Sequence, residues 1–155
     1  MRYNSVLLAV EDIDKARKFY CDVLGLHVTA DFGANITLTG GISLQSKKSW
    51  MKFIHKPESE IRFGGNDAEI YFEEDNLAAF VEKLKSRGDV SLVHDIVEHD
   101  WGQHAVRFYD PDGHIIEVSE SMKFVCRRFL QQGMTVEETA KRSQMPIRFV
   151  KFCLK

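Results

Sequence analysis

Residues 108–118 read FYDPDGHIIEV, two apolar runs joined by a turn of definable type. Pro111 presets φ at the first corner of a type I turn, and Gly113 can take the left-handed conformation that follows it in a three-residue hairpin loop. Counting outward from such a loop places Arg107 opposite Glu117 on neighbouring antiparallel strands. The sequence therefore predicts a β-hairpin with a defined register.

This register divides the hairpin into two faces. Three apolar side chains share the first face: Phe108, Ile116 and Val118. Four mostly polar side chains share the second: Arg107, Tyr109, Ile115 and Glu117. A charged residue among apolar strand neighbours is either paired or functional, and the arginine directly opposite favours a salt bridge for Glu117. We expect such a pair to orient a polar ligand.

Composition places the chain among globular proteins. It has 155 residues, of which 44% are hydrophobic, enough for a packed core. No apolar run approaches the roughly 20 residues of a membrane span, so we expect no membrane association. The sequence begins with a strand pattern, from which we expect no signal peptide and a cytoplasmic location. The three cysteines have no paired spacing and are expected to be free thiols.

Charge is unevenly distributed along the chain. Residues 121–155 contain eight lysines and arginines and two glutamates, a net charge of +6, which leaves −8 for residues 1–120 in a chain of net charge −2. This asymmetry predicts one domain over residues 1–120 and a separate basic, helical extension over residues 121–155.

The first 120 residues contain a weak internal repeat. Alternating apolar residues predict a strand at about 6–10, and helical spacing predicts a helix at about 13–24, followed by three short strand-like runs. The same order returns in the second half, where a shift of about 64 residues places Ser5 on Glu69. The chain therefore reads as strand, helix and three strands, twice.

The repeat predicts the fold class. We expect an α+β protein with two βαβββ modules, at about 3–46 and 67–120, whose sheets form a cupped mixed sheet. A three-helix extension follows the second module. Residues 46–66 are polar and irregular and are expected to be a linker between the modules.

Two groups of residues resemble a known family. The first is VEDI at 10–13 with FY at 19–20 and VLGL at 23–26, and the second is DPDGH at 110–114 followed by Glu117. Their order and separation resemble the vicinal oxygen chelate superfamily, which contains glyoxalase I, extradiol dioxygenases, and fosfomycin- and bleomycin-resistance proteins. The resemblance covers about residues 3–120 and implies a cup that binds a small molecule, often in a homodimer. It does not select among the chemistries that the fold hosts.

The resemblance also implies where a metal would be bound. The family's metal positions map to Ser5, Ser43, Glu69 and Glu117, whereas metal-dependent members usually have histidine on a first strand and glutamate on a last strand. Only Glu117 matches, and hydroxyl groups are poor ligands for transition metals at neutral pH. We therefore expect no metal or other cofactor. The alternative is a metal-dependent glyoxalase- or dioxygenase-like enzyme in which Glu69 and Glu117 hold a divalent cation.

Glu69 and Glu117 are the candidate catalytic residues. Glu69 has no obvious partner: burial would suit it to general-base catalysis, whereas a place at a strand end would leave it solvated, and the sequence leaves both alternatives open. Eight further residues are candidates for ligand binding: Ser5, Leu7, Ser43, Gln45, Trp50, Tyr71, Arg107 and Tyr109. The six histidines do not cluster in the sequence, so no histidine-based site is predicted.

The extension has the pattern of three helices. Apolar residues recur at helical spacing from Met122 to Leu130, and TVEE at 135–138 is a capping box. A third helix is expected after a proline at 146, with three residues facing inward: Ile147, Val150 and Leu154.

Two interpretations of this extension follow from its spacing and charge. Ala140 and Val150 occupy positions found in helix-turn-helix units, with Gln144 at the turn, which is consistent with DNA binding by a dimer. The favoured interpretation is a helical cap that packs on the acidic body of the chain or of a partner, so no nucleic-acid partner is expected. The leading function is then a resistance-type or other small-molecule-binding protein that acts without metal, and a ligand-responsive DNA-binding protein is a further alternative.

Overall fold

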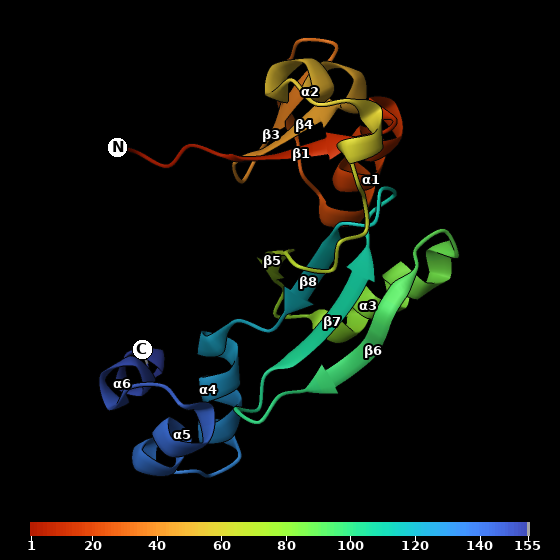
Figure 1. Cartoon of the computed structure of the whole chain (residues 1–155). Coiled ribbons are helices and arrows are strands. Elements are labelled where there is room, and N and C mark those ends of the chain that lie inside the picture. The colour runs from red at the N-terminus through yellow and green to blue at the C-terminus, as the bar shows by residue number, and fades with distance from the viewer. Residues whose placement is uncertain (155) are drawn as a thin grey trace. The chain divides into compact units, whose positions relative to one another are not determined.

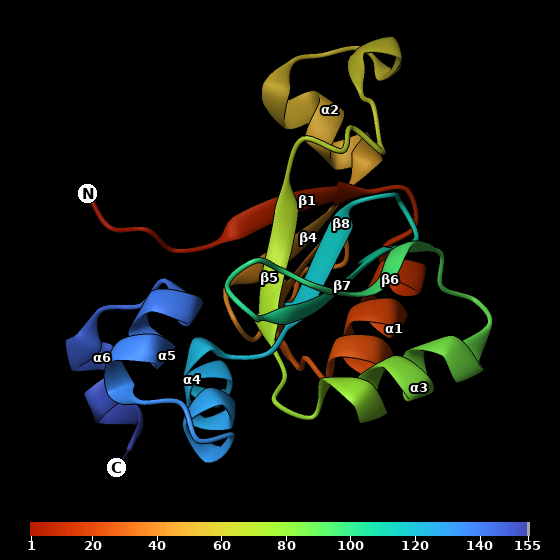
Figure 2. The ribbon, with the colours of Figure 1, turned by 90° about the horizontal axis from the view of Figure 1, so that it is seen from below.

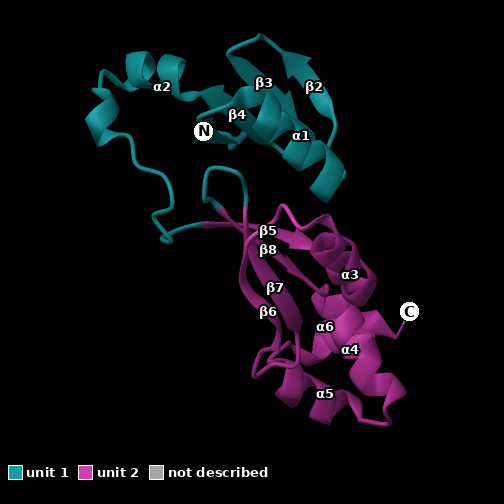
Figure 3. Ribbon diagram, turned by 90° about the vertical axis from the view of Figure 1, so that its right-hand side faces the viewer, with its two compact units in different colours: residues 1–68, 110–114 teal, residues 69–109, 115–155 magenta. Residues whose placement is uncertain are grey.

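The computed structural model describes residues 1–154 and has the predicted α+β class (Figure 1). Figure 3 distinguishes two compact units: unit 1 contains residues 1–68 and 110–114, and unit 2 contains the other described residues. Each unit holds one four-stranded sheet, and unit 2 also holds the C-terminal helices. Within residues 1–154 no helix is long and apolar enough to cross a membrane. The predicted domain boundary at residue 120 and the joining of the sheets into a cup stay predictions.

The sheet of unit 1 has the strand order β1-β4-β3-β2, with β1 parallel to β4 and the other neighbours antiparallel. Its strands are β1 (Val6–Val10), β2 (Val28–Asp31), β3 (Asn35–Leu38) and β4 (Ile42–Ser46). Helix α1 (Ile13–Leu24) packs against β3 and β4. The apolar side chains on the covered face of this sheet include Val10, Ile36 and Leu44, all less than 2% exposed.

Helix α1 begins and ends where its sequence predicts. The Asp12 carboxylate accepts hydrogen bonds from the backbone N–H groups of Asp14 and Lys15, both at 3.0 Å. Gly25 ends the helix with φ of 68°, a left-handed conformation that residues with a Cβ rarely adopt. These caps fix the helix so that Tyr20 is fully buried.

The loop of the predicted hairpin, residues 110–114, belongs to unit 1, and Tyr20 of α1 holds it there. Its hydroxyl donates to Asp110 Oδ2 at 2.8 Å, and His114 Nδ1 lies 2.8 Å from the same oxygen. Burial opposes the charged form of His114, but the hydrogen bond and the charge of Asp110 outweigh it and raise the pKa of His114. Burial likewise opposes the charge on Asp110, but His114 and Tyr20 lower the pKa of that carboxyl.

The expected irregular linker is wrong in part. Residues 47–54 form helix α2 (Lys47–Ile54), and Glu58–Glu60 form one turn of 3-10 helix. Lys47 joins these segments to the module, because its Nζ lies 2.9 Å from Glu11 Oε2 and 2.8 Å from Glu58 Oε1. Helix α2 has no buried residue, although its apolar residues Trp50, Met51, Phe53 and Ile54 have the spacing of one helical face, a signal that the expectation of a linker did not use.

Unit 2 repeats the topology of unit 1, with strand order β5-β8-β7-β6 and a parallel β5–β8 pair. Its strands are β5 (Glu69–Glu73), β6 (Leu92–Glu98), β7 (His104–Tyr109) and β8 (Ile115–Ser119). Helix α3 (Leu77–Arg87) lies on the apolar face, where the rings of Phe80 and Phe108 are 6.1 Å apart. The predicted internal repeat is therefore confirmed at the level of strand order.

The hairpin of β7 and β8 has the predicted register. Arg107 pairs with Glu117, and Gly113 has φ of 86°. The three residues predicted for the apolar face, Phe108, Ile116 and Val118, are at most 2% exposed. Turn chemistry and strand alternation were sufficient to specify this element.

The extension forms three helices, as predicted: α4 (Met122–Gln131), α5 (Val136–Ser143) and α6 (Ile147–Cys153). Their shared core is formed by Cys126, Val150 and Cys153. The predicted capping box at Thr135 is present. Two inward assignments are wrong, because Ile147 is 45% and Leu154 62% exposed, whereas Val150 is buried as predicted. The buried positions of α6 are three residues apart, which gives this short helix a narrow apolar stripe.

The extension packs on the sheet of its own unit, as the favoured interpretation expected. Figure 2 shows α4 directly after β8. Arg128 Nη2 donates to the carbonyl oxygen of Gly102 at 2.6 Å and lies 2.8 Å from Glu120 Oε2. Arg142 Nη2 lies 3.0 Å from Glu98 Oε1, and the Phe129 ring fills the space beside Gly102 where a Cβ would lie. Basic helices and acidic strand ends therefore meet within unit 2.

Candidate ligand-binding site

One polar row crosses the whole sheet of unit 2. The register places Tyr71 of β5 beside Glu117 of β8, Glu117 beside Arg107 of β7, and Arg107 beside His94 of β6. These side chains lie on the face opposite α3, because they alternate with buried residues such as Phe108 and Ile116. The row combines a cation, a carboxylate, a phenol and an imidazole on one surface.

Arg107 joins two carboxylates at the centre of this row. Its Nη2 forms an ion pair with Glu117 Oε2, which confirms the predicted pair. Its Nε donates to Glu69 Oε2 at 2.8 Å, so the expectation that Glu69 has no partner is wrong. The side chain of Glu117 is 6% exposed, that of Arg107 22% and that of Glu69 39%. A bridging guanidinium holds both carboxylates in fixed positions.

These exposures distinguish the two carboxylates. Glu117 also accepts a hydrogen bond from Ser119 Oγ at 2.5 Å and is enclosed by its neighbours. Glu69 lies at the start of β5 and is exposed, so burial, the condition set for a general base, is not met there. Of the three charged groups, Glu69 and Arg107 are the ones that a ligand can reach.

Tyr71 is anchored by a residue that the sequence did not indicate. Gln103 Nε2 donates to the Tyr71 hydroxyl at 3.2 Å and to the backbone oxygen of Glu120 at 2.7 Å. Burial is the main cause that raises the pKa of Tyr71, so its phenol stays protonated at neutral pH. The side chain is nevertheless 47% exposed, which makes its ring available for contact. Gln103 lies in the turn before β7, where no periodicity marks a residue as important.

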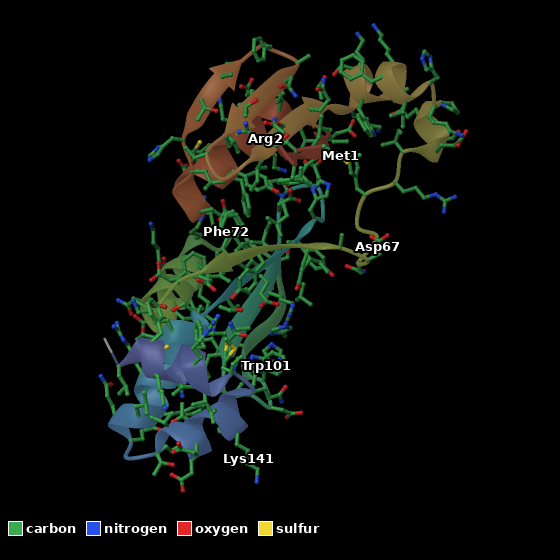
Figure 4. All side chains as sticks on the ribbon, turned by 90° about the vertical axis from the view of Figure 1, so that its left-hand side faces the viewer. Met1, Arg2, Asp67, Phe72, Trp101 and Lys141 are labelled. Carbon is green, nitrogen blue, oxygen red and sulfur yellow. The ribbon has the colours of Figure 1, made fainter. Side chains whose placement is uncertain are left out.

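One histidine contacts Arg107 and a second senses its charge, although the sequence gave no reason to group them. His94 Nε2 lies 3.4 Å from Arg107 Nη1, and the ring of His99 stacks on Trp101 with centroids 4.4 Å apart. Burial, followed by the charges of Arg107 and His94, lowers the pKa of His99, which is therefore neutral at pH 7. Figure 4 labels Trp101, in the turn between β6 and β7.

The other predicted ligand-binding residues lie in unit 1. Leu7 of β1 and Ser43 of β4 are register partners, Ser5 precedes β1, and Trp50 lies on α2. Gln45 is 2% exposed, and its amide is already engaged within the unit: Oε1 accepts from Asn35 at 2.8 Å, and Nε2 donates to the backbone oxygen of Ala34 at 3.0 Å. Gln45 therefore joins β4 to the start of β3 rather than presenting a free amide.

The structure thus groups the predicted residues into two sets. Unit 1 contains Ser5, Leu7, Ser43, Gln45 and Trp50. Unit 2 contains Glu69, Tyr71, Arg107, Tyr109 and Glu117. Within the second set Tyr109 is half-buried and pairs with Ile115, one step along the strands from the Arg107–Glu117 pair. Within the second set, ion pairs connect Glu69, Arg107 and Glu117, and Tyr71 lies beside Glu117 in the strand register.

The side chains of unit 2 do not fit a divalent cation. Glu69 and Glu117 share the Arg107 guanidinium, which offsets one of their two negative charges and engages Oε2 of each carboxylate. A metal coordinated directly by both carboxylates would have to compete with this guanidinium for their oxygens. Within residues 1–154 no three His, Cys, Asp or Glu side chains are grouped in a way that could hold a metal ion.

Comparisons with known proteins agree with this fold. A family model described as a glyoxalase-like domain matches residues 3–123. A solved protein of unknown function from Agrobacterium tumefaciens is 35% identical, with a TM-score of 0.71 over 78% of this chain and 94% of its own. An integron cassette protein from the mobile metagenome of V. cholerae is 26% identical, with a TM-score of 0.59 over 78% of this chain and 95% of its own.

A more distant structure extends the likeness. A glyoxalase/bleomycin resistance protein/dioxygenase from Nocardioides is 16% identical, with a TM-score of 0.62 over 76% of this chain and 81% of its own, and it supports the fold alone. No protein with a curated description matches. Since the family model matches residues 3–123, the chain belongs to the glyoxalase-like family of the vicinal oxygen chelate superfamily, and three helices, α4 to α6, follow its last strand β8.

Proposed function

We propose that this protein binds a small molecule on the polar face of the unit 2 sheet and does so without a catalytic metal. The observation that carries the proposal is the Arg107 guanidinium held between Glu69 and Glu117, beside an exposed Tyr71 ring. A fixed constellation of this kind orients a ligand by hydrogen bonds while an aromatic surface supplies apolar contact. The shared guanidinium also supports the absence of a metal, because it engages one oxygen of each carboxylate and so competes with direct coordination of a metal by both.

The charge of this face indicates the class of ligand. Glu69, Glu73 and Glu117 carry three negative charges, whereas Arg107 is the cation that faces them. Glu73 accepts from the Tyr71 hydroxyl at 3.2 Å, so its carboxylate also lies next to the ring. An excess of carboxylates beside aromatic rings favours a cationic ligand with an aromatic or apolar portion.

The test compares two small molecules of similar size and opposite charge, benzyltrimethylammonium and benzoate. We expect amide resonances of β5 and β8 to shift in nuclear magnetic resonance spectra when the cation is added. Glu69→Gln should weaken this binding by about fivefold, the effect of losing one partly exposed ion pair. Glu82→Gln, which removes an exposed carboxylate on α3, is the control and should change nothing.

Two results would contradict the proposal. One is that benzoate binds this face as strongly as the cation does. The other is that Glu82→Gln and Glu69→Gln weaken binding equally, which would indicate long-range charge rather than a site.

The homodimer and the cytoplasmic location stay predictions. Analytical sedimentation at two protein concentrations would check the homodimer.

A further inference from the structure

Helices α5 and α6 form a helix-turn-helix unit. Their connection is residues 144–146, and Gln144 adopts a left-handed conformation with φ of 58° and ψ of 21°. Helix-turn-helix motifs join two helices by a turn of three or four residues and often have glycine at this left-handed position. The buried positions of the unit include Thr139, Ser143 and Val150, so small or branched residues line the contact between helices.

The second helix keeps one face free. Val150 and Cys153 are buried in the core shared with α4, whereas Arg148 and Lys151 are exposed. These two cations are three residues apart and therefore lie on the same side of α6. Phe152, 57% exposed, lies beside them on this side. In a DNA-binding unit the second helix must present such an unburied face to the major groove.

The first helix of the extension adds charge to the same face. Lys123 Nζ of α4 lies 5.5 Å from the centre of the Phe152 ring, and Arg127 Nε donates to the backbone oxygen of Cys153 at 2.9 Å. No acidic residue occurs in α4 or α6. Four cations from two helices therefore lie on or beside α6, with Arg127 at its C-terminal end.

The remaining cations of these helices serve a different purpose. Arg128 and Arg142 are used against Glu120 and Glu98 of the sheet, so the charge of the extension is divided between a docking side and a free side. Figure 4 also shows Lys141 on α5 extending away from the helices. Helices α4 and α6 carry cations and no carboxylate, so the face that they share is complementary to a polyanion, whereas α5 carries Glu137 and Glu138 in its first turn.

We propose that the exposed face of α6, together with Lys123 and Arg127 of α4, binds duplex DNA. The geometry favours a duplex, because a helix-turn-helix unit presents its second helix to a groove and phosphates on either side meet the flanking cations. The sequence-based expectation was that no nucleic acid binds. We depart from it because α6 has an exposed basic face. Residues 124–154 lie beyond the family model, so this function is separate from the ligand-binding face proposed above.

The test measures fluorescence anisotropy of a labelled duplex of mixed sequence with the full chain at several salt concentrations. Four phosphate contacts predict that log K falls with log salt with a slope of about −3.6. The double variant Arg148→Gln/Lys151→Gln should lower affinity by about tenfold or more at 0.1 M salt and make the slope shallower by about 2. Both side chains are exposed, so the melting temperature should not change.

The matched control removes the same charge elsewhere. Lys15→Gln/Lys83→Gln replaces exposed lysines of α1 and α3 and should leave affinity and slope unchanged. Equal weakening in both double variants, or no binding at 50 mM salt, would overturn the proposal. Polyglutamate that competes as strongly as duplex DNA would assign the face to acidic proteins and would also overturn it.

Discussion

Replacing Arg107 by alanine tests the centre of the candidate site. The side chain of Glu117 is 6% exposed, and removing one partner of a buried ion pair costs about 3–5 kcal/mol because the other charge is left unpaired. Two features reduce this value: Arg107 is itself 22% exposed, and Ser119 would still donate to Glu117. The more exposed pair with Glu69 adds at most about 1 kcal/mol. We expect Arg107→Ala to lower the free energy of unfolding of unit 2 by about 2–4 kcal/mol.

The assay must report on unit 2 alone. The chain has two tryptophans, Trp50 in unit 1 and Trp101 in unit 2. In a Trp50→Phe background, urea unfolding followed by the fluorescence of Trp101 gives the stability of unit 2 by linear extrapolation. Glu69→Gln in the same background is the control and should cost no more than about 1 kcal/mol. A loss below about 0.5 kcal/mol for Arg107→Ala would refute the reasoning, because it would mean that Glu117 does not need its partner.

Three further predictions concern other parts of the chain. The pKa of His114 is raised above its unfolded value of about 6.5, so its contribution to stability is fully present below that pH and is lost as pH rises through the folded pKa. The free energy of unfolding of unit 1, measured with urea at several pH values, should therefore fall above about pH 6.5. This fall should be absent in His114→Asn and present in the control His27→Asn, which replaces an exposed histidine. Parallel pH profiles for all three proteins would contradict this. Gly102 and Gly133 both have positive φ, but only at Gly102 would a Cβ meet the aromatic ring of α4, so Gly102→Ala should lower the melting temperature by several degrees more than Gly133→Ala. Equal shifts would mean that the ring adjusts freely. Ending the chain at residue 120 should also lower the melting temperature, because it removes the bonds of α4 to the sheet; an unchanged value would indicate a tethered, independent extension.

The hairpin was predictable because its determinants are local. Pro111 and Gly113 specify the loop, and strand alternation then fixes which residues face each other, so Arg107 opposite Glu117 follows without knowledge of the rest of the fold. Helix α1 was predictable for the same reason, since its first and last residues are marked by a capping carboxylate and a left-handed glycine.

The partner of Glu69 was not predictable in this way. Its ion pair with Arg107 crosses β8, so it depends on the order β5-β8-β7, which places strands far apart in sequence next to each other. A long arginine side chain reaches residues beyond its direct register partner, and alternation alone does not say in which direction. The contact of His94 with Arg107 has a different cause, because β6 and β7 are consecutive strands and their register shifts on both sides of His94. Non-local strand order and an irregular register, rather than side-chain chemistry, limited the prediction of the site.

The helical extension shows why one pattern of charge supported two interpretations. Arg128 and Arg142 meet carboxylates of the sheet, whereas Arg148 and Lys151 lie on the exposed face of α6. The cations that hold the extension on the sheet are therefore different from those on the exposed face of α6. Packing of the extension on the sheet does not compete with the binding of a polyanion. Truncation at residue 120 removes both sets together and so does not separate the two roles. The substitutions on α6 remove only the second set, so retained stability with weakened DNA binding is the combination that distinguishes a DNA-binding cap from a purely structural one.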